Sequence, residues 1–301
     1  METRAPLTTY LKLLLMAVFW GGTFVAGRLL AGEVSPFSAA FLRFSIASLA
    51  LLWLTLRAHG RPPLVARKQW LALLILGLSG VLAYNAFFFK GLERIEAGRA
   101  AVIIANNPIL IGLFAALLFG ERLTGKKIVG ILLSVCGAVI VITKGQPTTL
   151  LDGGIGRGEL LIFGCVVSWV IYSLVGRLAM RGLTPLVAVT YAALIGTGLL
   201  LFPALGEGVF SALSGYSLLA WICLLYLSLC GTVLSFVWYY QGIQQIGSTR
   251  AGQFINLVPV SAVLLSAWLL DEPLTGSLLV GLLLVSGGIY MNNRQPKKTA
   301  A

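Results

Sequence analysis

Ten apolar segments follow one another along this 301-residue chain, with short polar connections between them. A helix needs about 20 mainly apolar residues to cross the hydrocarbon core of a bilayer. The segments leave no room for a separate soluble domain, so the pattern predicts an all-α integral membrane protein with ten transmembrane helices. They cover about 10–29, 37–56, 69–89, 97–119, 127–143, 158–178, 187–206, 217–240, 249–270 and 277–292.

The charge content favours the same class. Charged residues make up 11% of the chain, against about 25% in soluble globular proteins. A net charge of +12 is also typical of nucleic-acid-binding proteins. Here, however, the basic residues lie in short loops between apolar segments and form no basic domain. We therefore interpret the positive charge as a topology signal and expect no nucleic-acid partner.

The chain repeats itself at fixed offsets. At an offset of 149 residues, WGGTFVAGRL at 20–29 matches WVIYSLVGRL at 169–178, and at an offset of 151, ERLTG at 121–125 matches EPLTG at 272–276. Chance similarity between apolar segments would not keep register at charged, glycine and proline positions. Because each copy holds five segments, an odd number, the second copy must enter the membrane from the opposite side. The sequence predicts two inverted five-helix repeats, 1–145 and 156–292, followed by a cytoplasmic tail at 293–301.

The distribution of Lys and Arg gives the expected orientation. With the N-terminus in the cytoplasm, most basic residues fall in cytoplasmic loops and ends, as the positive-inside rule requires. We therefore expect a multi-pass protein of the inner cell membrane with both termini cytoplasmic. Arg94 and Arg99 are the exception, because they are predicted to lie outside although the equivalent loop, with Arg250, is inside; Glu93 and Glu96 beside them reduce the local positive charge.

No pattern typical of catalysis is present. The only histidine, His59, lies in a loop, and the acidic residues lie at termini, loops or helix ends. This arrangement disfavours paired carboxylates, histidine-based triads and metal sites, so we expect no enzyme, cofactor or metal. It also disfavours the commonest proton relay, an Asp or Glu within the membrane.

Aromatic and polar side chains recur on equivalent helix faces. Residues three or four apart share a face of a helix, and inverted-repeat transporters commonly bind their substrate between the repeats. We therefore predict a central cavity lined from both halves. Interfacial aromatic belts and ordinary packing are the alternative for each tryptophan. The predicted lining residues are Trp20, Thr23, Tyr84, Trp169, Tyr172 and Trp238.

Two prolines lie inside spans beside amides. Pro108 follows Asn106, and Pro259 follows Asn256. A proline within a helix removes one hydrogen bond and frees a carbonyl group, which in a bilayer needs another partner or a wet cavity. We predict a hinge or kink at each proline. The two amides either contact the substrate or bond a neighbouring helix.

Arg43 lies about two turns inside the second span. A mid-membrane arginine costs about 2.5–3.5 kcal/mol on insertion scales. Its repeat equivalent is Ala192, so the repeat itself does not require it. Either Arg43 extends to the outer surface, or it contacts a substrate carboxylate or acts in gating.

These residues resemble the drug/metabolite transporter superfamily, specifically its EamA-type exporters. The resemblance covers about residues 10–291 and rests on Pro36 followed by Arg43-Phe44, on the run from Gly91 through Asn107-Pro108 to 120–124, and on its second copy from Pro259 to 272–276. It implies ten helices in two inverted units, a central cavity that opens alternately to each side, and export of amino acids or related metabolites.

Our leading hypothesis is therefore a secondary transporter that exports small metabolites, foremost amino acids or related compounds, by alternating access. The first alternative is a carrier of anionic metabolites that uses Arg43 and Lys90 as countercharges. The second, from a different class, is a membrane-embedded enzyme or scaffold. The expected partners are a small-molecule solute and the lipid bilayer, and a homodimer is left open.

Overall fold

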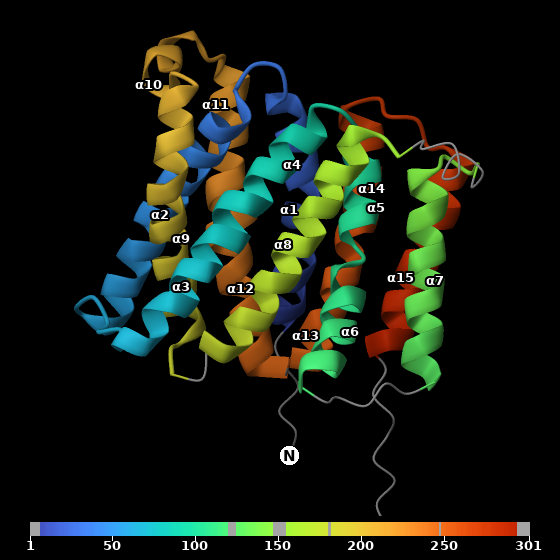
Figure 1. Ribbon diagram of the computed structural model, residues 1–301, viewed down its shortest axis with the longest axis horizontal. Coiled ribbons are helices and arrows are strands. Elements are labelled where there is room, and N and C mark those ends of the chain that lie inside the picture. The colour runs from blue at the N-terminus through green and yellow to red at the C-terminus, as the bar shows by residue number, and fades with distance from the viewer. Residues whose placement is uncertain (1–6, 120–124, 147–154, 180–181, 247, 294–301) are drawn as a thin grey trace, which may run out of the picture.

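The computed structural model describes residues 7–119, 125–146, 155–179, 182–246 and 248–293. Eight of its helical segments are long and apolar enough to cross a membrane, and two shorter apolar helices, Ile128–Ile142 and Gly276–Met291, accompany them. Figure 1 shows the long helices packed side by side along one common direction. The described part of the chain has no strand. The protein is an all-helical, multi-pass membrane protein.

Helix boundaries follow the apolar segments closely. The first half contains α1 (Leu7–Leu30), α2 (Pro36–His59), η1 (Arg67–Gln69), α3 (Trp70–Leu76), η2 (Gly77–Ala83), α4 (Tyr84–Leu92), α5 (Ala97–Ile104), α6 (Asn107–Phe119) and α7 (Gly125–Ile142). The second half contains α8 (Arg157–Ala179), α9 (Pro185–Gly206), α10 (Val209–Ala212), η4 (Leu213–Gly215), α11 (Leu218–Leu225), η5 (Tyr226–Leu234), α12 (Ser235–Ile246), α13 (Ser248–Gln253), η6 (Phe254–Asn256), α14 (Leu257–Leu269) and α15 (Gly276–Asn293).

Local sequence explains where several helices begin and end. α2 and α9 both begin at a proline, whose fixed φ suits the first helical position and whose missing N–H has no partner there anyway. Thr184 precedes α9, and its hydroxyl accepts a hydrogen bond from the Val187 backbone N–H at 3.4 Å. α2 ends at Gly60 with a φ of 72°, a left-handed conformation that glycine adopts without strain.

Two long segments contain a stretch of π-helix. η2 and η5 each continue an α-helix without a break, so that α3, η2 and α4 form one span and α11, η5 and α12 form another. At the offset of 151, Gly77–Ala83 corresponds to 228–234, which lies within η5. The apolar periodicity predicted one uninterrupted α-helix in each place. π-Helical turns are rare and occur frequently at functional sites.

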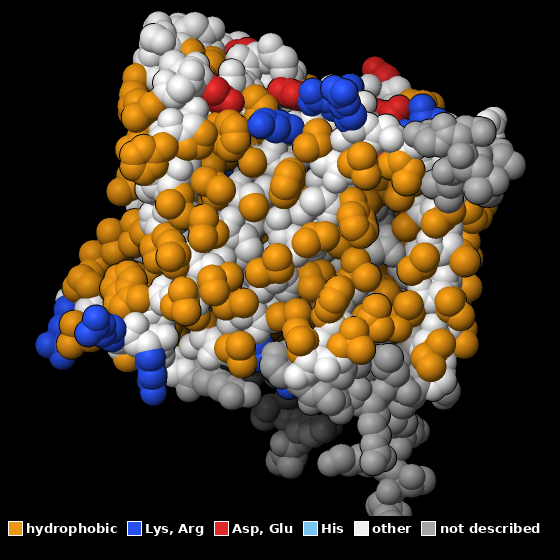
Figure 2. Space-filling model, in the orientation of Figure 1, with side chains coloured by type: hydrophobic (Ala, Val, Ile, Leu, Met, Phe, Trp, Pro, Cys, Tyr) orange, Lys and Arg blue, Asp and Glu red, His pale blue; other side chains and the backbone are white. Residues whose placement is uncertain are grey.

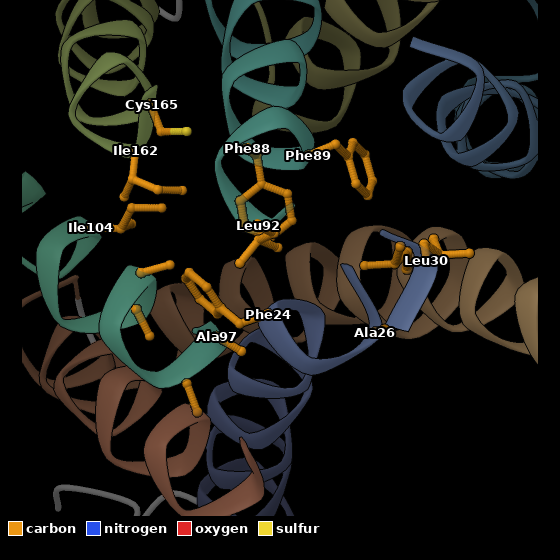
Figure 3. Close-up of a cluster of buried hydrophobic side chains, with 14 of the residues drawn as sticks. Phe24, Ala26, Leu30, Phe88, Phe89, Leu92, Ala97, Ile104, Ile162 and Cys165 are labelled. Atoms are coloured by element: carbon orange, nitrogen blue, oxygen red, sulfur yellow. The ribbon is translucent and has the colours of Figure 1, made fainter. Parts of the chain in front are cut away.

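The largest hydrophobic core lies where helices of both halves meet. Figure 3 shows side chains from α1, α4, α5 and α8 converging on one volume. Phe24 of α1 meets Phe88 of α4 with ring centroids 5.4 Å apart, and Ile162 of α8 is fully buried in the same cluster. The halves are therefore joined by continuous packing.

Contacts between the halves occur in reciprocal pairs. A Cβ atom on Gly91 would lie 2.5 Å from Ile162, and one on Gly242 would lie 2.7 Å from Leu13. Offsets of 151 and 149 convert each pair into the other. Ser48 and Thr197, themselves 149 residues apart, share a hydrogen bond between their hydroxyl groups at 2.9 Å. Repeat-equivalent positions therefore meet in space.

The surface is apolar between two polar ends. Figure 2 shows hydrophobic side chains over the whole middle of the visible face, with basic side chains at both ends and acidic ones only at the upper end. We call this upper end, where α1 ends and α2 begins, the acidic end. Together with the connections near it, it carries the acidic residues that the structure describes, namely Glu33, Glu93, Glu96, Glu159, Glu207, Asp271 and Glu272.

Carboxylates at the acidic end hold helix N-termini of the opposite half. Glu207 accepts hydrogen bonds from the backbone N–H groups of Phe37 at 3.2 Å and Ser38 at 2.7 Å. Glu272 accepts from the N–H groups of Ala97 at 2.7 Å and Gly98 at 3.0 Å. The first N–H groups of a helix lack partners within the helix, and the helix dipole favours a negative charge beside them.

Glu207→Ala is expected to lower the melting temperature in detergent. The substitution leaves the N–H groups of Phe37 and Ser38 without their carboxylate acceptor, at a cost of about 1–3 kcal/mol. Glu96→Ala is the control, because Glu96 precedes α5 but its side chain does not cap that helix. Equal melting temperatures for the two variants would show that the Glu207 contact contributes nothing to stability.

Candidate functional site

Aromatic side chains from α4 and α8 form a first aromatic cluster, Tyr84, Phe88, Trp169 and Tyr172. The rings of Trp169 and Tyr172 stack with centroids 5.0 Å apart, and Tyr84 lies 5.4 Å from Trp169. Tyr84 also stacks on Phe88 at 5.9 Å. The structure therefore brings together three of the predicted lining residues, Tyr84, Trp169 and Tyr172, each of them half-buried.

A second aromatic cluster, Trp20, Phe236, Tyr239 and Tyr240, lies between α1 and α12. Trp20 is 5.7 Å from both Phe236 and Tyr239, and its indole N–H donates to the Gly231 carbonyl at 3.0 Å. Each of the two clusters therefore combines side chains from both halves.

Two other predicted lining residues have mainly packing contacts. Trp238 stacks on Phe19 at 5.6 Å and is not part of either aromatic cluster. The Thr23 hydroxyl donates to the Trp20 carbonyl at 2.6 Å, and its methyl group lies 2.6 Å from where a Cβ on Gly231 would be. In the repeat-equivalent contact, Gly80 of η2 faces the Tyr172 ring of α8. These glycines allow α1 and α8 to approach η5 and η2 closely.

Arg43 lies buried between the halves. Its Nη1 donates to the Asn85 side-chain oxygen at 3.0 Å, and its Nη2 donates to the Thr232 hydroxyl at 3.3 Å. Nε is buried without a hydrogen-bond partner. The guanidinium thus points to α4 of one half and η5 of the other, and does not extend to the surface. We call Arg43, Asn85 and Thr232 the Arg43 centre.

Both partners of Arg43 are tied to the π-helical segments. The Asn85 side-chain amide donates to the Val81 carbonyl in η2 at 2.8 Å. The Thr232 hydroxyl donates to the Leu227 carbonyl, five residues earlier in η5, at 2.9 Å. The Arg43 carbonyl accepts from the Ser228 hydroxyl at 2.9 Å. Backbone irregularities of both halves therefore converge on one buried cation.

The Arg43 centre has no internal counterion in the described part of the chain. The ion pairs there are Arg94–Glu93 and Arg99–Glu159. Arg43 has only neutral acceptors, together with the Phe44 ring 5.2 Å from its Cζ atom. Lys90, the other predicted countercharge, lies with its Nζ 4.5 Å above the Phe37 ring and makes no contact with the Arg43 centre.

An irregular turn precedes each of the two predicted proline hinges. α5 ends at Ile104 and α6 begins at Asn107, just before Pro108. The 3-10 helix η6 ends at Asn256, three residues before Pro259. The Asn106 side-chain amide donates to the carbonyls of Val102 and Ile103, both at 3.2 Å, and its oxygen accepts from Ser134 at 2.9 Å.

These hydrogen bonds hold Asn106 to its own helical turn and to α7. They favour the interpretation that this amide bonds a neighbouring helix and does not contact the substrate. Asn256 is half-buried at the end of η6. Neither asparagine contacts an aromatic cluster through a hydrogen bond that the structure describes. The irregular turn just before each proline, at 105–106 and at 254–256, is therefore the clearer common feature of the two positions.

Comparison with known proteins identifies this arrangement as that of a membrane transporter. The profile of the EamA-like transporter family matches residues 7–143 and again residues 156–294. The chain belongs to the EamA-like transporter family, part of the drug/metabolite transporter superfamily. The family resemblance drawn from the sequence is thereby confirmed.

Several relatives cover nearly the whole chain. "Uncharacterized transporter YyaM" of Bacillus subtilis (strain 168) is 31% identical over 94% of this chain and 92% of its own length. "Uncharacterized inner membrane transporter YicL" of Salmonella typhimurium is 31% identical, with 96% of each chain covered. A solved structure titled "Crystal structure of protein" shares the fold, with a TM-score of 0.63 and 22% identity over 95% of this chain and 98% of that chain.

Proposed function

We propose that the protein exports small metabolites, foremost amino acids or related compounds, across the inner cell membrane by alternating access. The observation that carries the proposal is the set of reciprocal contacts between the halves around the aromatic clusters and the Arg43 centre. Alternating access requires two halves that can exchange their arrangements about a fixed site. Each half makes the contact that the equivalent residues of the other half also make, and this equivalence of the halves supports such an exchange.

The same contacts support ten spans in two inverted five-helix units. The two shorter helices, α7 and α15, pack along each other and would complete the count. A Cβ on Gly137 would lie 2.8 Å from the Gly281 carbonyl, and one on Gly288 would lie 2.4 Å from the Gly130 carbonyl. The offset of 151 exchanges these pairs too. In this topology both termini are cytoplasmic and the acidic end faces outward.

The residues around the interface suit an amino acid. Tyr84, Trp169 and Tyr172 offer flat apolar surfaces with polar edges, which are typical of small-molecule pockets. The alternative of an anion carrier with paired cations receives less support, because Lys90 and Arg43 have different surroundings. An enzyme also receives less support, since the family that matches the chain is a transporter family.

The direct test is uptake and efflux of labelled amino acids by proteoliposomes that contain the purified full-length protein. We expect flux for at least one zwitterionic amino acid with a large side chain, with and without an imposed proton gradient. Absence of flux for every member of the panel, with protein that is folded, would refute the proposed substrate class. Labelling of the tail in right-side-out vesicles tests the orientation.

Trp169→Ala is expected to reduce this flux about tenfold or more, because removing an aromatic wall costs several contacts in the transported state. Trp268→Ala is the matched control. The Trp268 side chain is 76% exposed on the outer surface of α14, so its loss removes no contact in the interface. Equal flux through the two variants would remove the first aromatic cluster from the transport path.

A further inference from the structure

We propose that the Arg43 centre is a binding subsite for the carboxylate of the transported compound. The proposal rests on the proposed function and names the substrate class more closely: a carboxylate with an aromatic or large apolar body. In the structure, Arg43 is held by the neutral side chains of Asn85 and Thr232. When the substrate binds, its carboxylate replaces the longer of these two bonds, the one to Thr232.

The donors on one edge of the Arg43 guanidinium are incompletely hydrogen-bonded. Nη1 is engaged by Asn85 at 3.0 Å. Nε has no partner, and Nη2 has only the longer bond of 3.3 Å to Thr232. Nε and Nη2 form the side edge of the guanidinium, and two parallel N–H groups on one edge match the two oxygens of a carboxylate. The unmade bond and the weak bond therefore lie together on the edge that a carboxylate uses.

The other buried arginine of the described chain shows what Arg43 lacks. Arg99 is buried to a similar degree, and its Nε also lacks a hydrogen-bond partner. Its Nη2, however, lies 2.7 Å from the Glu159 carboxylate. A buried charge is costly unless a partner compensates it, and a charge within a membrane is commonly functional. Arg99 has a carboxylate from the protein, whereas Arg43 has only Asn85 and Thr232. We therefore assign the role of counterion for Arg43 to a carboxylate of the substrate.

The surroundings of Arg43 indicate the rest of the ligand. Tyr84 directly precedes Asn85, the partner of Arg43 Nη1, on α4. It belongs to the first aromatic cluster, where it contacts Trp169. In the proposed complex, the carboxylate binds Arg43 and the apolar remainder of the molecule contacts these rings. Thr232 belongs to the opposite half from Arg43, so an anion that replaces this bond also releases one contact between the halves.

The test compares ligands that differ only in the charged group. Binding of phenylacetate, phenylacetamide, phenylalanine and phenylalaninamide to the full-length protein in detergent is measured by tryptophan fluorescence and by thermal shift. We expect each acid to bind at least about tenfold more tightly than its amide, since hydrogen bonds to charged groups are worth about 1.5–3 kcal/mol. Equal binding of acid and amide, or binding of none of the four, would overturn the subsite.

Asn85→Asp is the decisive variant, because it adds a carboxylate beside Arg43 with almost no change in shape. We expect it to raise the melting temperature and to abolish the preference for acids. If Arg43 were only structural, the melting temperature would rise while any ligand preference stayed the same. Lys90→Gln is the control and should retain the preference; its loss there would also overturn the assignment.

Arg43→Lys adds a test of geometry, because a lysine keeps the charge but lacks the paired N–H groups. A partial loss of the acid preference is expected, and full retention would contradict a two-point contact. The proposed function fails separately, by absence of flux for every compound in the proteoliposome panel. Flux of neutral and acidic compounds at the same rate would preserve that function and overturn only the Arg43 subsite.

Discussion

Gly288→Ala is expected to destabilise the protein strongly, whereas Gly287→Ala, one residue earlier on the same helix, is not. A Cβ on Gly288 would lie 2.4 Å from the Gly130 carbonyl oxygen and 2.9 Å from the Ser134 backbone nitrogen. Because both neighbours are backbone atoms of α7, neither can move aside without shifting that helix. Overpacking of this kind costs about 1–3 kcal/mol, and more where the backbone must move.

Gly287 provides the control because nothing lies within 4 Å of its Cβ position. Alanine there should be neutral or stabilising by about 0.5–1 kcal/mol, since glycine within a helix is unfavourable. The measurement is the thermal unfolding of both variants in the same detergent. If Gly137→Ala, the reciprocal change on α7, lowers the melting temperature as well, the pairing of α7 with α15 is supported from both sides. Similar stability of the Gly288 and Gly287 variants would contradict it.

The helical spans could be predicted from sequence because the bilayer imposes one simple requirement. The predicted segment 10–29 corresponds to α1 at Leu7–Leu30, and 187–206 corresponds to α9 at Pro185–Gly206. The π-helical turns could not be predicted, because one extra residue in a turn hardly alters the pattern of apolar residues. The Gly-Ser content of 77–80 was the available signal, and it is common in membrane helices for packing reasons alone.

The repeat located part of the candidate site, and Arg43, whose repeat equivalent is Ala192, was predicted without it. Trp20 and Trp169 were found because they are equivalent in the two copies, and each lies in an aromatic cluster. Asn85 and Thr232 were missed, because their equivalents at the offset of 151 are Phe236 and Val81. An asymmetric substrate needs an asymmetric site, so the residues that would distinguish one end of a ligand from the other are those that a repeat comparison overlooks.

Electrostatic partners distant in sequence were missed for a related reason. The predicted neighbours of Arg94 and Arg99 were Glu93 and Glu96, which are close in sequence. The structure pairs Arg94 with Glu93 at 3.1 Å, as expected, but pairs Arg99 with Glu159 of the other half. The acidic residues were assigned from sequence only to termini, loops and helix ends, whereas three of them bind helices across the interface. Contacts of this kind depend on the tertiary arrangement and leave no local pattern.

Glu159→Gln is expected to cause the largest loss of stability among single polar substitutions at the acidic end. Arg99 and Glu159 retain only 10% and 8% of their side-chain exposure and lie 2.7 Å apart. Removing one charge leaves Arg99 buried without a counterion, which costs about 3–5 kcal/mol. The control is Glu93→Gln, because Glu93 and Arg94 are 32% and 46% exposed and exposed pairs contribute about 0–1 kcal/mol.

The double variant Arg99→Met, Glu159→Leu separates charge from packing. Replacing both members of a buried ion pair by apolar residues is often neutral, so the double variant should recover most of the melting temperature that Glu159→Gln loses. If it does not, the pair holds α5 against α8 by its shape and not by its charge. If Glu159→Gln and Glu93→Gln prove equally mild, Arg99 tolerates burial without a counterion. The contrast between Arg43 and Arg99 would then no longer support the assignment of a substrate carboxylate to Arg43.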